Sequence, residues 1–330
     1  MTQAQTRRQI LAGAACLSAS IALLGGSERL EAFPERPLRI LLGASPGSVP
    51  DMVARLISDK LSAALRAPVI VENRPGASGM IAMQALVSST PDGYTLAVAT
   101  MSQAVFNSYL FSKLPYDPLR DLEPICPLVV GAMAIGAHPA VPANTLAEFI
   151  SLAKARPGDF SIGTAGMGSP PDLVARLLMQ AAAIDVRIIP FRTGGEGLTG
   201  VMRGDVDLFV DAPPMIGPQA KAGTVKVLAV TGRAREPEMP NAQTAAEAGF
   251  PGVQGEAWIG LVAPPRTPTE ISARLGREIA GILVAPEVQQ RLAVLSFRPL
   301  IATADEFRTL ILDEHKRWGA IIREAGIKLD

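Results

Sequence analysis

Short apolar runs alternate along this chain with longer segments whose apolar residues recur every three or four positions. The first run covers residues 40–42, and the segment after it carries Val53, Leu56, Ile57 and Leu61. A short continuous apolar run is typical of a buried strand, and the wider spacing is typical of one face of a helix. Strands that alternate with helices predict parallel sheets with helices on both faces.

The same pattern continues to the end of the chain. Two further apolar stretches, residues 125–138 and 258–262, are interpreted as strands that cross between two lobes. The tail after residue 269 carries no glycine-rich loop, and we predict that it supports the first lobe. Other strands are predicted at residues 69–74, 94–100, 160–162, 186–191, 208–210, 225–230 and 297–301, and tail helices at residues 269–284, 287–295 and 305–326.

A glycine-rich turn joins the first predicted strand to the first predicted helix. Gly43, Pro46 and Gly47 break the strand, and Ser48 is predicted to be the helix N-cap, with Asp51 at the capping-box position. The N–H groups at a helix start have no partner within the helix and attract anions. This turn is therefore a candidate anion site.

The chain contains a second copy of this turn. Residues 48–57 read SVPDMVARLI, residues 169–178 read SPPDLVARLL, and seven of the ten positions are identical. The second copy also follows a strand-like run and a loop with Gly163, Gly166 and Gly168. One explanation is two ordinary strand-to-helix turns, because amphipathic helices resemble each other. The shared Ser-x-Pro-Asp opening favours the other explanation, two similar half-sites with one in each lobe.

Length and composition restrict the classes of function. A chain of 330 residues predicts two domains. The formal net charge is zero and aromatic residues make up 5% of the chain, which argues against a basic footprint or a stacking surface for nucleic acid. The sequence holds two histidines and no His-Glu-x-x-His, P-loop or Gly-x-Ser-x-Gly motif, so we predict no catalytic residue, metal or cofactor. His315 is predicted to lie on a solvated helix face and His138 to be structural.

The N-terminus has the pattern of an export signal. Arg7 and Arg8 precede an apolar stretch, residues 11–25, that is rich in small residues and shorter than a membrane-spanning helix. We predict a signal peptide of the twin-arginine type over residues 1–32 and a periplasmic mature protein, with an uncleaved anchor as the alternative. Cys16 lies in this segment, so Cys126 remains without a second cysteine and is predicted to be a small buried group.

One motif points to a different class of protein. Gly195, Gly197 and Gly200 spell G-x-G-x-x-G after a predicted strand, as in a nucleotide-dependent enzyme. That fingerprint requires an acidic residue ~20 positions later for the ribose, and residues 215–220 read MIGPQA with no acid. We therefore interpret the motif as a loop and helix start in the second lobe.

Candidate ligand contacts lie in the loops that follow the predicted strands. Ser48 and Ser169 either cap their helices, contact the ligand, or do both. Asp51 and Asp172 suit first-turn caps better than direct contacts, because a carboxylate repels an anion. Asp211 would accept a hydrogen bond from a ligand hydroxyl or amine. The predicted ligand-binding residues are Gly47, Ser48, Asp51, Ser102, Gly168, Ser169, Asp172, Thr193, Gly194 and Asp211.

These groups suffice to bind a carboxylate without a metal or a catalytic base. A helix N-terminus contributes ~0.3–1 kcal/mol to binding of an anion, and each charge-assisted hydrogen bond contributes ~1.5–3 kcal/mol. Micromolar affinity requires about 8 kcal/mol in total. Arg192 offers a further group, either as the partner of a ligand carboxylate or as a solvent-facing side chain beside a strand end.

Six segments resemble the Bug (TctC-like) solute-binding proteins of tripartite tricarboxylate transport systems. They are PERPLRILLGASPGSVPDMVARLI, VIVENRPGASG, TPDGYTLAVAT, KLPYDPLRDLEPI, VLAVTGRAREPEMPNAQTAAEAGFPG and WIGLVAP, in the same order, and the similarity covers roughly residues 33–329. The resemblance implies a periplasmic two-lobed binding protein that closes on a small carboxylate. This chain departs from the family pattern at Ser48, which replaces a glycine, at Val49 or Pro50, which replaces a hydroxyl residue, and at Asp172, where a histidine is common.

Together these observations predict an α/β fold of the two-lobed periplasmic binding protein type, a type II-like Venus flytrap. Each lobe would be a mostly parallel sheet flanked by helices, with two crossover strands at the hinge. Residues 33–133 and 259–330 are predicted to form the first lobe and residues 134–258 the second. The predicted function is capture of a di- or tricarboxylate or a related organic anion, without catalysis.

The predicted partners follow from this function. They are the small organic anion and, transiently, the subunits of a tripartite tricarboxylate-type membrane transporter, and the protein itself is predicted to be a monomer that binds no nucleic acid. A periplasmic ligand sensor that acts on a receptor kinase is the alternative.

Overall fold

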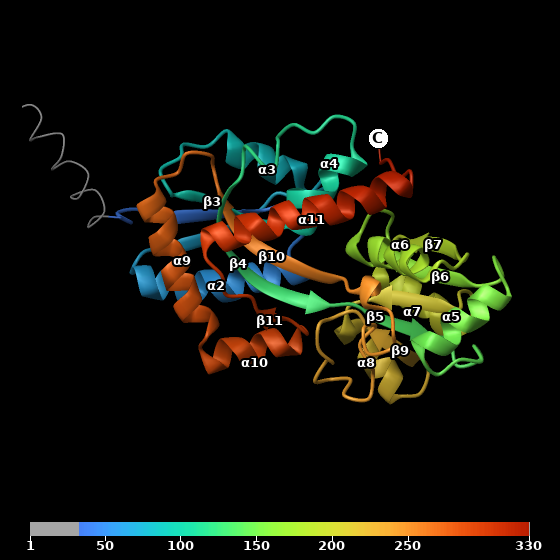
Figure 1. Ribbon diagram of the computed structural model, residues 1–330. Coiled ribbons are helices and arrows are strands. Elements are labelled where there is room, and N and C mark those ends of the chain that lie inside the picture. The colour runs from blue at the N-terminus through green and yellow to red at the C-terminus, as the bar shows by residue number, and fades with distance from the viewer. Residues whose placement is uncertain (1–32, 330) are drawn as a thin grey trace, which may run out of the picture.

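The structure is a computed structural model that describes residues 33–329, so the predicted signal peptide lies outside the described residues. Two α/β lobes lie side by side, and each has its own sheet (Figure 1). The predicted alternation of strands and helices is confirmed, and the two-lobed α/β fold with it. Both sheets are mixed, because each contains antiparallel pairs beside its parallel ones.

The first lobe is built on a six-stranded sheet. Its strands are β1 (Leu38–Leu42), β2 (Val69–Asn73), β3 (Thr95–Thr100), β4 (Glu123–Ala132), β10 (Glu256–Ala263) and β11 (Arg298–Pro299), in the order β11-β4-β10-β3-β1-β2. Its helical segments are α2 (Val49–Leu65), η1 (Ala77–Gly79), α3 (Met80–Val87), η2 (Ser102–Phe106), α4 (Asn107–Leu110), α9 (Thr269–Leu283), α10 (Pro286–Val294) and α11 (Ala304–Glu324). β1 pairs in parallel with β2 and β3, whereas β10 is antiparallel to β3 and β4.

The second lobe is built on a five-stranded sheet. Its strands are β5 (Ala134–Ala137), β6 (Ser161–Ala165), β7 (Arg187–Phe191), β8 (Leu208–Asp211) and β9 (Lys226–Val230), in the order β7-β6-β8-β5-β9. Its helical segments are α5 (Leu146–Ala155), α6 (Pro170–Ala182), α7 (Gly194–Arg203), α8 (Pro213–Lys221) and η3 (Pro251–Val253). β6 is parallel to β7 and β8, and β5 is antiparallel to β8 and β9.

The chain crosses between the lobes in two places. β4 of the first sheet leads directly into β5 of the second sheet, and the chain returns through the segment between β9 and β10. The predicted long strand over residues 125–138 is therefore two strands, divided at Met133. Thr231 joins the two crossings, because its backbone N–H donates to Met133 O (2.8 Å) and its Oγ1 accepts from the N–H of Met133 (2.9 Å).

The strand directions decide which edges of the two sheets face each other. β4 and β3 are both antiparallel to β10, so β3 and β1 run in the direction of β4 and end on the side of the crossing. In the second sheet Asp211, the last residue of β8, pairs with Ala134, the first residue of β5 after the crossing. β6 and β7 run with β8. The carboxyl ends of the parallel strands in both lobes therefore point toward the crossing.

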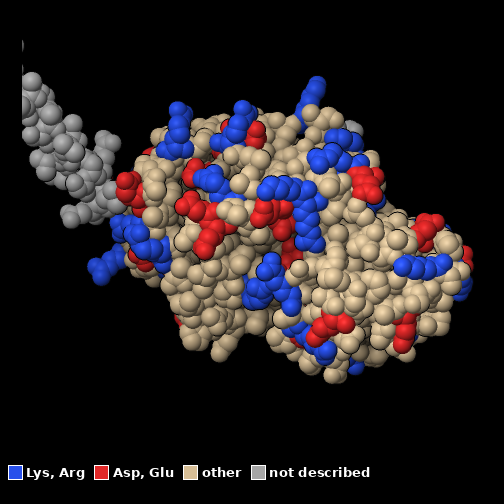
Figure 2. All heavy atoms as spheres, in the orientation of Figure 1, with Lys and Arg blue, Asp and Glu red and all other residues tan. Residues whose placement is uncertain are grey.

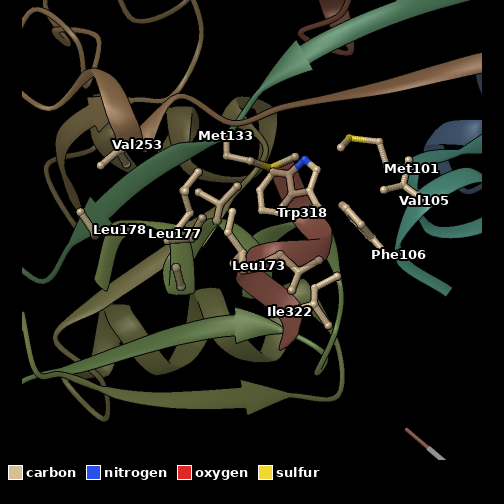
Figure 3. Packing of buried hydrophobic residues seen from close by; sticks show 14 of the residues in the cluster. Met101, Val105, Phe106, Met133, Leu173, Leu177, Leu178, Val253, Trp318 and Ile322 are labelled. Carbon is tan, nitrogen blue, oxygen red and sulfur yellow. The ribbon is translucent and has the colours of Figure 1, made fainter. Parts of the chain in front are cut away.

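The last helix, α11, packs against both lobes. It contacts β4 and η2 in the first lobe and α6 in the second. Trp318 and Ile322 of α11 belong to one buried cluster with Phe106 of η2 and Leu173 of α6 (Figure 3). The prediction that the tail supports the first lobe is therefore incomplete for α11. Its apolar face is wide enough to cover side chains of the second lobe as well.

We expect that replacing Thr231 with valine destabilises the protein by ~1–3 kcal/mol, because valine keeps the shape but leaves a buried N–H without its acceptor. Thr231 is 0% exposed, and its Oγ1 also donates to Gly255 O. Urea denaturation measures the change. Thr224→Val, at an exposed threonine in the same lobe, is the control. An equal free energy of unfolding for the two variants would show that Thr231 does not join the crossings.

Candidate functional site

Asp51 holds the first loop, residues 43–48, onto the start of α2. Its Oδ2 atom accepts hydrogen bonds from the N–H of Gly47 (2.9 Å) and from Arg55 Nε (3.0 Å). Its Oδ1 atom accepts from Asn73 Nδ2 (2.8 Å), at the end of the neighbouring strand β2. The hydrogen bond from Arg55, with those from Gly47 and Asn73, lowers the pKa of Asp51 to about 2. Asp51 is 3% exposed, so it is a buried carboxylate whose negative charge is balanced within the loop.

Asp172 holds the second loop, residues 166–169, in the same way. Its Oδ2 atom accepts from the N–H of Gly168 (3.0 Å) and from Arg176 Nε (3.0 Å). Its Oδ1 atom accepts from Thr164 Oγ1 (3.3 Å) on β6. Asp172 is 0% exposed. The repeat in the sequence is therefore also a repeat of atomic contacts, with the glycine four residues before each aspartate and the arginine four residues after it.

Ser48 and Ser169 occupy the predicted N-cap positions of α2 and α6. Both have extended backbone, and each hydroxyl donates to a carbonyl of its own loop, Ser48 Oγ to Ser45 O (2.7 Å) and Ser169 Oγ to Gly166 O (2.8 Å). Ser169 Oγ also accepts from the N–H of Asp172 at 3.4 Å, whereas the Ser48 side chain makes no cap hydrogen bond. In place of the reciprocal capping box, each aspartate accepts a hydrogen bond from the N–H of the glycine before the cap.

The supply of backbone N–H groups at these loops is smaller than the sequence suggested. The N–H groups of Gly47 and Gly168 already donate to the aspartates. Pro50, Pro170 and Pro171 lie in the first helical turns and have no N–H. An anion at either loop would therefore rely on the serine residues more than on the glycine amides that we predicted as donors.

Ser102 follows β3 as predicted, and two residues after it, Gln103 and Asn107, hold a neighbouring segment that was not among the predicted site residues. The N–H of Ser102 donates to Thr100 Oγ1 (3.2 Å). Gln103 Nε2 and Asn107 Nδ2 both donate to Ser78 O, at 3.0 and 3.2 Å. Gln103 and Asn107 are 8% and 1% exposed. The sequence signal that could have identified them is the pair of amide side chains, four residues apart, within an apolar segment.

Thr193, Gly194 and Asp211 lie together in the second lobe. Thr193 caps α7 by accepting from the N–H of Glu196 (3.2 Å). A Cβ atom added to Gly194 would lie 2.5 Å from Asp211 Oδ2, so a larger residue here would displace this carboxylate. Asp211 Oδ1 accepts from the N–H of Ala212 (2.7 Å), and burial raises the pKa of Asp211 above its ordinary value.

Two of the three glycines of the G-x-G-x-x-G motif serve packing. A Cβ atom on Gly197 would lie 2.4 Å from the ring of Phe209, and one on Gly200 would lie 2.8 Å from the ring of Phe191. Both glycines let α7 approach the sheet closely. The interpretation of the motif as a helix start is confirmed, because α7 begins at Gly194, but all three glycines lie inside the helix and none lies in a loop.

The predicted residues form two groups at the facing edges of the sheets. In the first lobe they follow β1 and β3, and in the second they follow β6, β7 and β8. The second loop also lies against the first lobe, because a Cβ atom on Gly168 would be 2.9 Å from Leu110 of α4 and 3.0 Å from Leu329. Ligands of open α/β sheets commonly bind outside the carboxyl ends of strands.

The two histidines make contacts that hold the fold. His315 is 7% exposed, with Nε2 2.7 Å from Ala104 O and Nδ1 3.2 Å from Tyr109 Oη, and burial lowers its pKa. The prediction of a solvated His315 is wrong, because its side of α11 packs against η2 and α4. His138 Nδ1 accepts from the N–H of Ala140 (3.2 Å), in the predicted structural role. Cys126 is buried as predicted, and burial raises its pKa to about 12.

The described part of the chain also gives two results on metals and membranes. Across residues 33–329, no three His, Cys, Asp or Glu residues are grouped so that they could hold a metal ion. Within the same residues, no helix combines the length and the apolar character that crossing a membrane requires. Basic and acidic side chains are interspersed over the face of the molecule drawn in Figure 2.

Comparison with known proteins gives consistent results. Residues 53–327 match the model of the family TctC, the tripartite tricarboxylate transporter family receptor. Protein BugT of Bordetella pertussis is 30% identical over 300 residues, which cover 91% of this chain and 92% of BugT.

Two solved structures are similar over most of their length. MatC from Rhodopseudomonas palustris with bound malate is 31% identical, with a TM-score of 0.72 over 88% of this chain and 100% of MatC. The R. palustris protein Rpa4515 with adipate is 28% identical, with a TM-score of 0.77 over 90% of this chain and 100% of that protein. The chain therefore belongs to the TctC family of tripartite tricarboxylate transporter receptors, which are periplasmic solute-binding proteins.

Proposed function

We propose that this protein binds a small organic carboxylate between its two lobes and delivers it to a tripartite tricarboxylate-type membrane transporter. The observation that carries the proposal is the pair of matching loops, which stand at sheet edges that both point toward the crossing. Two relatives of the same fold, solved with malate and with adipate, support the choice of ligand class. The moving units would be residues 33–133 with 259–330, and residues 134–258.

The chemistry of the loops suits a carboxylate. Ser48 and Ser169 hydroxyls turn from their loop carbonyls to the ligand, and each such charge-assisted bond contributes ~1.5–3 kcal/mol. Gly194 and Gly195 are the first two residues of α7, and unlike the prolines at the starts of α2 and α6 both have a backbone N–H. The positive end of α7 therefore adds a third group of donors. Asp51 and Asp172 do not touch the ligand in this arrangement, because their oxygens already accept hydrogen bonds from the loop glycines and from arginines of α2 and α6.

Asp211 would discriminate among carboxylates. Asp211 is partly buried beside Gly194, and its ionised carboxylate accepts from a ligand hydroxyl or ammonium but repels a second carboxylate. The protein would therefore favour a carboxylate that also carries a hydrogen-bond donor. Malate against succinate is the matched pair that shows this preference.

A thermal-shift screen of the mature chain tests the proposal. With malate, succinate, adipate and citrate at saturating concentration, we expect at least one to raise the Tm by about 4 °C or more, as ligand at 100 times its Kd adds ~2.7 kcal/mol. Neutral amides of the same acids are the control and should give no shift. A folded protein that none of these acids stabilises would contradict the proposal.

A further inference from the structure

The Asp172–Arg176 pair repeats the contacts that the Asp51–Arg55 pair makes at Oδ2. In both pairs the aspartate Oδ2 accepts from the N–H of the glycine four residues earlier, at 2.9 Å in the first lobe and 3.0 Å in the second. The same oxygen accepts from Nε of the arginine four residues later, at 3.0 Å in both lobes. The two pairs differ in the group that approaches Oδ1, which is Asn73 of a neighbouring strand in the first lobe and Thr164 of β6 in the second.

Both oxygens of Asp172 are used inside the protein. Oδ2 accepts from Gly168 and Arg176, and Oδ1 accepts from Thr164, with Arg176 Nη2 at 3.5 Å from the same atom. The carboxylate is 0% exposed, and so a ligand cannot reach it without breaking these bonds. Asp172 therefore acts on a ligand through the loop that it holds.

The second loop needs such a support. Gly166 and Gly168 have φ angles of +86° and +71°, which few other residues adopt. The turn from Gly166 to Ser169 is closed by one long backbone bond, Ser169 N to Gly166 O at 3.3 Å, and by the Ser169 hydroxyl. If that hydroxyl turns to a ligand, the bond from Gly168 to Asp172 is the principal remaining tie on the loop.

Arg176 fixes the direction of the carboxylate. Its side chain is 22% exposed, compared with 50% for Arg55, and it lines a groove of about 270 Å³ between α6 and α11. The guanidinium therefore lies between the loop and the helix that links the lobes. Because its Nε and Nη2 both face Asp172, the aspartate keeps one orientation, with Oδ2 toward Gly168.

We propose that Asp172 and Arg176 are positioning residues that hold the second loop in its binding shape before the ligand arrives, as Asp51 and Arg55 do in the first lobe. This inference rests on the proposed function, since it assumes that Ser169 contacts the ligand. Under this proposal each half-site has a loop that is held by an aspartate and an arginine at matching positions of the repeat.

Amide hydrogen exchange tests the support without any ligand. In Asp172→Asn, we expect the Gly168 amide of the mature chain to exchange ~10-fold or more faster, while protected amides of α5 in the same lobe keep their rates. Arg176→Lys should give a smaller acceleration at Gly168, because lysine keeps the charge but not the planar fork. The control is Arg156→Lys, which changes an exposed ion pair with Asp159 elsewhere in the same lobe.

Titration with malate and with adipate tests the consequence for binding. For whichever acid the wild type binds, Kd should rise ~10-fold or more in Asp172→Asn, by an intermediate factor in Arg176→Lys, and not at all in Arg156→Lys. Unchanged exchange at Gly168, or an equal acceleration at every protected amide, would overturn the proposal.

The two tests separate two kinds of failure. A wild type that binds neither acid contradicts the proposed function, while a selective change at Gly168 still demonstrates the support of the loop. If Asp172→Asn does not fold, Arg176→Lys carries both measurements alone, and wild-type values for its Gly168 exchange and its Kd would overturn the proposal.

Discussion

Replacing Trp318 with alanine is expected to destabilise the protein by ~3–5 kcal/mol, the range for large aromatic residues removed from a core. Trp318 is 2% exposed and packs edge to face on Phe106 of the first lobe, with ring centroids 5.4 Å apart. A Cβ atom on Gly255 would lie 3.9 Å from the Trp318 ring and 2.8 Å from Val174 of α6, so the indole also stands beside the second lobe. The cavity would therefore open where α11 covers both lobes.

Urea denaturation followed by circular dichroism measures this loss. Leu312→Ala is the control on the same helix, since Leu312 is 40% exposed and should change the free energy of unfolding by less than about 1 kcal/mol. We also expect faster amide exchange in α6 for Trp318→Ala, because α6 loses part of its cover. Equal effects of the two substitutions would contradict the role of α11 as a link between the lobes.

The second large effect is expected at Asp51. Its pKa lies at about 2 in the folded protein and at the ordinary 3.8 when exposed, so its charged form stabilises the fold above pH 4. That stabilisation is lost as the pH falls from 3.8 through about 2, where the folded protein also takes up the proton. Asp51→Asn should therefore cost ~2 kcal/mol near pH 7 and much less near pH 2.

Denaturation of both proteins at several pH values checks this sign. The difference in free energy of unfolding between wild type and Asp51→Asn should shrink as the solution becomes more acidic, since other groups titrate in both proteins alike. Asp59→Asn, at an exposed position of the same helix, should show no comparable difference. A difference that stays constant from neutral to acid pH would exclude the ionised pair with Arg55 as its cause.

The elements of this fold follow from local patterns, and most of them were predictable. The apolar run before Gly43 predicts β1, and the helical spacing from Val53 to Leu61 predicts α2, because burial on one face needs only a local period. The repeat of Ser-x-Pro-Asp correctly predicted that two helix starts have the same local structure. These features depend on residues that are close in sequence.

Contacts between distant segments were beyond the reach of such patterns. His315 lies among charged neighbours in the sequence. Its burial depends on contact with η2, a segment that is distant from His315 in the sequence. The partner of each Asp oxygen was likewise hidden, because the capping-box rule does not anticipate an arginine four residues later that competes for the carboxylate. Gln103 was missed for the same reason, since its partner Ser78 lies in η1, far away in the sequence.

The central claim is that two matching loops bind one anion together. The most direct measurement is an NMR titration of the labelled mature chain with the carboxylate that stabilises it best, following the amide signals of Ser48 and Ser169. We predict that both signals shift and that both saturate with the same Kd. A shift at one serine alone, or two different Kd values, would contradict the claim.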